Sequence, residues 1–193
     1  MLQLEPALVW RHFDLLCSIP RRSKHEAALR QAIADWAAGK GLDHQIDPTG
    51  NLLIRKPGTK GKESAPAVAM QAHLDMVCQA NSGTHHDFDK DPITPVVKDG
   101  WLLAENTTLG ADNGIGVALA LAALEDDKLS HPPLEVLLTI DEEAGMSGAH
   151  GLQPGLLRAT RMLNLDTEEW GEFYLGCAGG SDAGASRHGL PGQ

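Results

Sequence analysis

Apolar runs in this chain repeatedly end in a histidine or a carboxylate. The residues at or just beyond these run ends are His73, Asp75, Asp112, Glu142, Glu143 and Asp166. At strand ends of an α/β sheet, such side chains are expected to converge on one crevice. One imidazole with several carboxylates is the ligand set of a hydrolytic zinc site, in which one further carboxylate stays free as a base.

Strand and helix patterns alternate in the part of the chain that carries these residues. We expect strands over residues 67–72, 101–104, 134–140, 162–165 and 172–175, and an alanine-rich helix over residues 114–124. Residues 81–95 have the polar composition of a loop. The alternation predicts an α/β layered domain with a largely parallel sheet.

The first forty residues predict two helices, and a hairpin follows them. Apolar residues from Leu8 to Leu16 form one helical face. Ser23 and Glu26 have the spacing of a capping box, which predicts that Ser23 starts the second helix. The hairpin is expected to consist of residues 43–46, a turn at 48–50 and residues 51–55.

The composition narrows the choice of partners. The net charge is -10, from 26 acidic against 16 basic residues, which argues against binding to nucleic acid or to an anionic membrane. The apolar stretch over residues 115–124 falls short of the roughly 20 residues that a membrane-spanning helix needs. The N-terminus does not resemble a signal peptide, and the three cysteines are far apart. We therefore expect a cytoplasmic protein with no nucleic-acid and no membrane partner.

Each motif has a simpler structural explanation when it is taken alone. His73 could bond to a nearby turn, and Asp112, between two glycines, could cap a helix. Glu142 and Glu143 could belong to a solvated acidic loop, and Asp166 to a polar turn. The coincidence of these placements, each after an apolar run, is what favours a site.

The spacing of the motifs also suggests what each could do. His73 and Asp75 lie two residues apart on an extended segment, so both point to the same side, and a carboxylate commonly orients a metal-bound imidazole. Asp112 could bridge two cations. Adjacent residues on an extended segment point opposite ways, so one of Glu142 and Glu143 could bind metal while the other acts as the base.

Longer strings in the sequence resemble a known family. They are Asn51–Lys56, Gln71–Val77, Thr107–Gly116, Glu142–Met146 and Gly176–Gly180. They are similar to the aminoacyl-histidine dipeptidases, which belong to a zinc peptidase group that also includes carnosinases, carboxypeptidase G-type enzymes and aminoacylases. The resemblance runs from about Trp10 to Gly180.

The resemblance implies two zinc ions and a set of ligands, with cobalt or manganese as possible substitutes. His73 and Asp166 would bind one ion, and Glu143 would bind the other. Asp112 would bridge both ions and form a cis peptide bond with Asn113.

The resemblance also implies the catalytic residues and the substrate. Asp75 would orient His73, and Glu142 would be the general base and acid. The substrates would be dipeptides with a free amino end, such as X-His and beta-alanyl-histidine.

The family fold is a three-layer α/β/α sandwich, and the resemblance implies that it is incomplete in this chain. Residues 1–180 would form the N-terminal part of the catalytic domain, and residues 181–193 an irregular tail without a family match. The lid domain, the C-terminal return and most of the family's dimer surface would be absent. Two alternatives stay open: an inactive fragment that binds metal weakly, and an aminoacylase-like deacylase.

Overall fold

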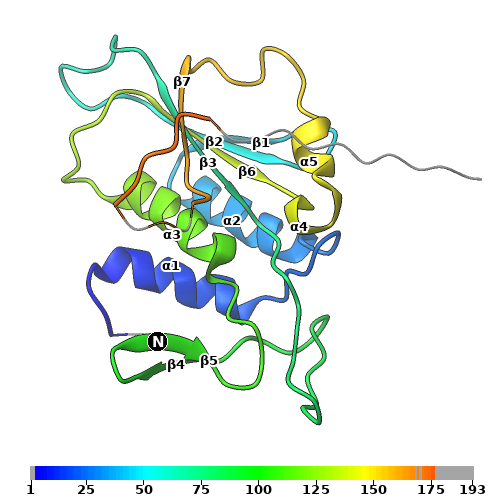
Figure 1. The fold of residues 1–193 in the computed structure, drawn as a ribbon. Coiled ribbons are helices and arrows are strands. Elements are labelled where there is room, and N and C mark those ends of the chain that lie inside the picture. The colour runs from blue at the N-terminus through cyan, green and yellow to red at the C-terminus, as the bar shows by residue number, and fades with distance from the viewer. Residues whose placement is uncertain (1–2, 168, 170, 177–193) are drawn as a thin grey trace, which may run out of the picture.

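A computed structural model describes residues 3–167, 169 and 171–176 of the chain. Its helices are α1 (Ala7–Ser18), α2 (Ala27–Gly39), α3 (Ala111–Glu125), α4 (Glu142–Gly145) and α5 (Ser147–His150). Its strands are β1 (Asp43–Ile46), β2 (Leu52–Lys56), β3 (Val68–His73), β4 (Pro95–Lys98), β5 (Trp101–Ala104), β6 (Leu134–Thr139) and β7 (Arg161–Asn164). Figure 1 shows these elements in one layered arrangement of sheet and helices. The α/β fold class is confirmed.

The main sheet has five strands in the order β1-β2-β6-β3-β7. β3 runs parallel to β6 and to β7, whereas β1 with β2 and β2 with β6 are antiparallel. The sheet is therefore mixed rather than largely parallel, because the hairpin joins it through β2. The parallel half contains the strand ends that bear the predicted site residues.

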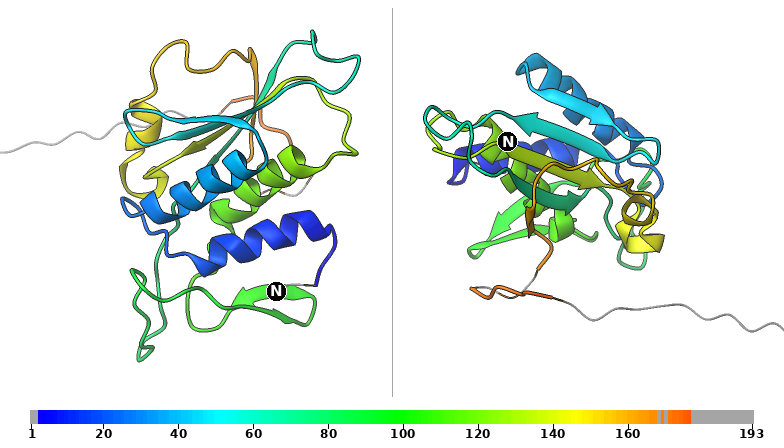
Figure 2. Two further views of the ribbon diagram at one scale, coloured as in Figure 1. Left: turned by 180° about the vertical axis from the view of Figure 1, so that it is seen from behind. Right: turned by 90° about the horizontal axis from the view of Figure 1, so that it is seen from above.

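Helices α1, α2 and α3 enclose the main core together with the sheet. α2 packs against β1 and β2, α3 packs against β3 and β6, and α1 packs on α3, as Figures 1 and 2 show. All six residues of β6 are buried, as expected for a central strand with an apolar run. The alanines of α3 leave room for the helix to lie close to the sheet, and most of its residues are buried.

Two local predictions are wrong. The helix α2 begins at Ala27, and Ser23 is not its cap; the Ser23 hydroxyl instead donates a hydrogen bond to Asp75. Residues 172–175 form no strand. A tertiary contact has displaced the local capping pattern in the first case, and in the second the segment lacks a pairing partner among the described residues.

The hairpin of β4 and β5 was only half predicted. β4 begins at Pro95, the last residue of the segment expected to be a polar loop, and it pairs with β5 in a separate two-stranded sheet. This small sheet lies on the side of α1 that faces away from the main sheet (Figures 1 and 2).

No helix in the part of the chain that the structure describes has the length and apolar character needed to cross a membrane. The expected tail, residues 181–193, lies outside the described residues.

Candidate metal centre

The predicted site residues meet where the parallel strands end. His73 is the last residue of β3 and is paired in register with Thr139, the last residue of β6. Glu142 and Glu143 follow β6 by only a few residues, and Asp166 follows β7, which lies on the other side of β3. The parallel pairing therefore brings segments that are far apart in the sequence to one edge, as expected for an α/β sheet.

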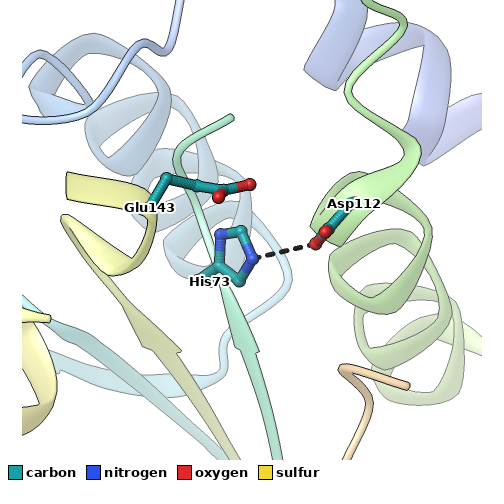
Figure 3. Close-up of side chains that lie close together, drawn as sticks. All are labelled: His73, Asp112 and Glu143. Atoms are coloured by element: carbon teal, nitrogen blue, oxygen red, sulfur yellow. Dashed lines mark hydrogen bonds and ion pairs between the residues drawn. The ribbon is translucent and has the colours of Figure 1, made fainter. Parts of the chain in front are cut away.

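His73 lies at the centre of the group with only 1% of its surface exposed. Its Nε2 atom is 3.0 Å from Oδ1 of Asp112, and its Nδ1 atom is 3.2 Å from Oδ1 of Asp75. Figure 3 shows Asp112 at the start of α3 and Glu143 on α4 approaching the imidazole from different sides. The ring is thus fixed between two carboxylates that contact different nitrogens.

Asp75 is fully buried and holds several groups of the site at once. Its two oxygens accept hydrogen bonds from the backbone amides of Glu142 and Glu143, at 3.0 and 3.1 Å. Burial alone would raise the pKa of Asp75, but its contacts with His73, Ser23 and these amides lower that pKa to about 2. Asp75 is therefore a permanent carboxylate, suited to fix the orientation of His73.

Two further carboxylates face the same nitrogen of His73. Oε2 of Glu142 is 3.9 Å from Nε2, and Oδ1 of Asp166 is 3.8 Å from it. Two sets of possible ligand atoms result, each within 4.8 Å of one another: His73 with Asp112 and Glu143, and His73 with Glu142 and Asp166. Both sets use His73, so they describe one continuous group rather than two separate sites.

Burial and mutual repulsion change the acidity of these groups. Burial raises the pKa of Glu142 and of Glu143, and neighbouring carboxylates raise both further. Burial alone would lower the pKa of His73, but Asp75 and the charge of Asp166 raise it to about 9. A carboxylate with a raised pKa accepts a proton more readily than an ordinary glutamate does.

The donor set fits a divalent metal. One buried imidazole is surrounded by Asp112, Glu142, Glu143 and Asp166, which together carry more negative charge than a protonated His73 could balance. Nitrogen and oxygen donors of this kind bind zinc and similar ions. A cation would relieve the repulsion that raises the pKa values of the glutamates.

Asn113 is a residue of the site that sequence reasoning did not assign a role. Its buried side-chain amide donates to the backbone carbonyl of Leu165 at 3.1 Å and to Oδ1 of Asp166 at 2.6 Å. The expected cis peptide bond between Asp112 and Asn113 is confirmed. Gly116 leaves the space that the Asn113 side chain occupies, because a Cβ atom at Gly116 would collide with Oδ1 of Asn113. Only the position of Asn113 beside Asp112 in the sequence hints at its role.

A pocket of about 260 Å³ opens beside the group and is lined by Asp112, Glu143, Val77 and residues 108–111. A larger pocket of about 390 Å³ lies at the opposite end of the strands, between β2 and the start of β6. In the larger one, Arg55 is already paired with Glu135 and Asp43. We place the candidate site at the smaller pocket because it adjoins Asp112 and Glu143, two of the candidate metal ligands.

Comparison with known protein families decides the relationship. Residues 69–184 match the family model described as peptidase family M20/M25/M40. The chain belongs to this family. The matched region contains all six predicted site residues.

Individual M20 relatives agree with this assignment. The cytosol non-specific dipeptidase of Escherichia coli strain K12 is 54% identical over 96% of this chain. The crystal structure of aminoacylhistidine dipeptidase from Vibrio alginolyticus is also 54% identical, with a TM-score of 0.85 over 86% of this chain. The chain spans 38% and 34% of the length of these two relatives.

A more distant solved structure shares the fold alone. It is the YXEP protein of Bacillus subtilis, described as a dinuclear metal binding peptidase of the M20 family. It is 15% identical, with a TM-score of 0.50, over 81% of this chain and 41% of its own.

Proposed function

We propose that this chain carries the N-terminal catalytic part of a metal-dependent dipeptidase that cleaves dipeptides with a free amino end. The observation that carries the proposal is the buried His73, with Asp112, Glu142 and Asp166 within 4 Å of its Nε2 atom. The chain's membership of the M20 peptidases and its 54% identity to a dipeptidase support peptide-bond hydrolysis as the reaction.

The proposed cofactor is a pair of zinc ions. His73 and Asp166 would bind one ion, Glu143 would bind the other, and Asp112 would bridge them. A histidine nitrogen binds one ion, so His73 can serve only one of the two ligand sets that contain it. The dinuclear site described for the YXEP protein supports two ions.

The proposed mechanism assigns each acidic residue a separate task. The bound metal would supply an acidified water and polarise the peptide carbonyl. Glu142 would take a proton from that water and pass it to the leaving amine, a task suited to its raised pKa. Asp75 would hold the tautomer of His73 and, through its bonds to the amides of Glu142 and Glu143, the start of α4.

The proposed substrates are small. The pocket beside Asp112 and Glu143 has a volume of about 260 Å³, which suits a dipeptide such as X-His or beta-alanyl-histidine better than a folded protein. The name of the Escherichia coli relative supports a dipeptide substrate and a cytosolic location.

The experiment is a zinc determination together with hydrolysis of Gly-His by the purified chain. We expect two zinc ions per chain, and Glu142→Ala should lower turnover by roughly 10²- to 10⁴-fold while zinc content stays the same. His73→Ala should lower zinc content as well as turnover. Glu105→Ala, at an exposed glutamate beyond β5, is the matched control and should change neither.

Two other results would contradict the proposal. Zinc binding without turnover would mean that this chain is a metal-binding fragment. Loss of zinc in Glu142→Ala would make Glu142 a ligand instead of the base, and the proposed mechanism would then be wrong.

A further inference from the structure

The segment of residues 21–26, between α1 and α2, contacts the loops that carry the candidate metal ligands. It contributes three polar side chains that point into the protein, those of Arg21, Ser23 and Glu26. Arg21 is 2% exposed and Glu26 is 3% exposed. Arg22 in the same segment forms an isolated parallel bridge with Met76, which follows β3. Burying such groups is costly unless each finds a partner, so their partners show what the segment does.

Arg21 joins two of the loops that carry the site. Its guanidinium donates to the backbone carbonyls of Leu74 and Asp75, both at 2.9 Å, and to the carbonyl of Gly110. Gly110 has a positive φ of 72°, and a Cβ atom there would collide with Arg21 and Met76. The end of β3 and the loop that leads to Asp112 are therefore held by one side chain.

Ser23 bonds to the side chain of Asp75. Its hydroxyl donates to Oδ2 at 2.7 Å, the oxygen that also accepts the backbone amide of Glu143. Oδ1 of Asp75 is left for His73 and for the amide of Glu142. Ser23 thus completes the set of donors that fixes the carboxylate on which His73 depends.

Glu26 holds the third loop. Its Oε1 accepts the backbone amide of Asp141 at 2.9 Å, and the same oxygen accepts the amide of Lys24 within the segment. Asp141 has a positive φ of 54° and directly precedes Glu142. The bond from Glu26 therefore constrains the turn from which α4 presents the two glutamates.

None of the three side chains supplies an atom to the ligand sets around His73. Their bonds to residues outside the segment, as described above, end on the residues that set the position of those ligands. We propose that residues 21–26 are a positioning segment, in which Arg21, Ser23 and Glu26 align the His73, Asp112 and Glu142 loops for metal binding. This inference rests on the proposed function for its purpose, but its geometric part can be tested without metal.

The first test measures amide hydrogen exchange in metal-free protein. We expect Glu26→Ala to speed exchange at Asp141 by about tenfold or more, because its acceptor is lost. We expect Ser23→Ala to speed exchange at Glu142 and Glu143. Exchange at Val136 and Leu137 in β6 should stay unchanged in both variants, since those amides report on the stability of the whole sheet.

The second test measures binding of Co²⁺ alone, through its visible absorption spectrum. Removing a partner that orients a ligand typically weakens metal binding by roughly 10- to 100-fold, which is the loss we expect for Ser23→Ala and Glu26→Ala. Ser23→Thr and Glu26→Gln keep the hydroxyl and the acceptor oxygen, and should restore affinity. Ser18→Ala is the matched control, because among the described residues the Ser18 hydroxyl bonds only to Leu15 of its own helix.

A double substitution tests whether Ser23 acts through Asp75. In an Asp75→Asn background, adding Ser23→Ala should cause much less additional loss than it does alone. If the losses of Co²⁺ affinity in Ser23→Ala and Asp75→Asn add in full, Ser23 does not act through Asp75.

The outcomes separate the two proposals. If the unsubstituted chain binds no Co²⁺, the proposed function fails, and the exchange experiment still decides the role of the segment. Two results would overturn the positioning role: exchange rates at residues 141–143 that do not change, or rates that rise there and at Val136 and Leu137 of β6 by the same factor. If Glu26→Ala does not fold, the comparison of Ser23→Ala with Ser23→Thr decides it.

Discussion

At the residue scale, His73 must lose a proton before it can bind a metal. Its contacts with Asp75 and Asp166 raise its pKa to about 9, so the imidazole is protonated at neutral pH in the metal-free protein. A metal ion must therefore displace this proton. We expect the apparent affinity for Zn²⁺ to rise with pH, by up to about tenfold per unit, and to level off above pH 9. Calorimetric titrations between pH 6.5 and 9.5 measure this.

The variant Asp75→Asn is the control for that pH dependence. It removes a negative partner of His73, so the pKa of the imidazole should fall, and the affinity should level off at a lower pH. A pH profile that does not move in this variant would show that another group releases the proton.

Asn113 leads to a second prediction at the residue scale. Asn113→Ala removes the donor that bonds to Asp166 and to the carbonyl of Leu165. We expect metal affinity to fall by roughly 10- to 100-fold, because one ligand loses its support. Asn81→Ala, at an exposed asparagine paired with Asn106, should leave affinity unchanged. Equal effects of the two substitutions, measured by Co²⁺ titration, would contradict the role of Asn113.

At the element scale, α1, α2 and α3 are joined by a cluster of polar and charged side chains around the partly buried Glu125, at the end of α3 opposite Asp112. Nε2 of His12 on α1 lies 2.8 Å from Glu125 on α3, and the same glutamate pairs with Arg11 and Lys40. The ring of His12 packs edge-on against Trp36 of α2. Burial lowers the pKa of His12 in the folded protein below its usual 6.5, although Glu125 acts in the opposite direction.

This cluster should make the protein less stable in acid. Because the folded pKa of His12 is lower than the unfolded value, the unfolded chain binds more protons as the pH falls below about 6.5. The contribution of His12 is therefore fully present above pH 6.5 and is lost as the pH falls through the folded pKa. We expect this loss to stay below about 1.4 kcal/mol per pH unit. Urea unfolding from pH 7.5 to 5.0 measures this loss. In His12→Gln, the free energy of unfolding should change less with pH over this range.

At the scale of the whole molecule, the main sheet has an open side at β7. Within the described residues, β7 is the edge strand and pairs only with β3. Its Met162 is 49% exposed and its Leu163 is 53% exposed. An exposed apolar edge strand offers unpaired backbone groups to another chain.

We therefore expect this chain to associate as its concentration rises. Leu163→Lys should reduce the association, because a charge on an edge strand disfavours pairing. Leu119→Lys is the matched control, since Leu119 on α3 is similarly exposed at 46% but lies away from the edge. Sedimentation velocity over a range of concentrations measures the effect, and an equal response to both substitutions would rule out the β7 edge as the cause.

The sequence by itself predicted most of the elements and the candidate site residues that the structure brings together. Apolar runs defined β3, β6 and β7, and the residues directly after them could be recognised because a strand end is a local feature. The M20 resemblance, with its long strings around His73 and Asp112, is likewise a property of the linear sequence.

Only the tertiary structure decided the direction of the strands and the support of the site. The sheet is mixed because β2 pairs antiparallel with β6. Strand direction depends on such pairing between distant segments. Ser23 has the local spacing of a cap, yet its hydroxyl donates to the buried carboxylate of Asp75, and α2 begins only at Ala27. Arg21, Glu26 and Asn113 acquire their roles from partners that lie 52 to 115 residues away in the chain. Such contacts leave no local pattern, since they depend on how the layers pack.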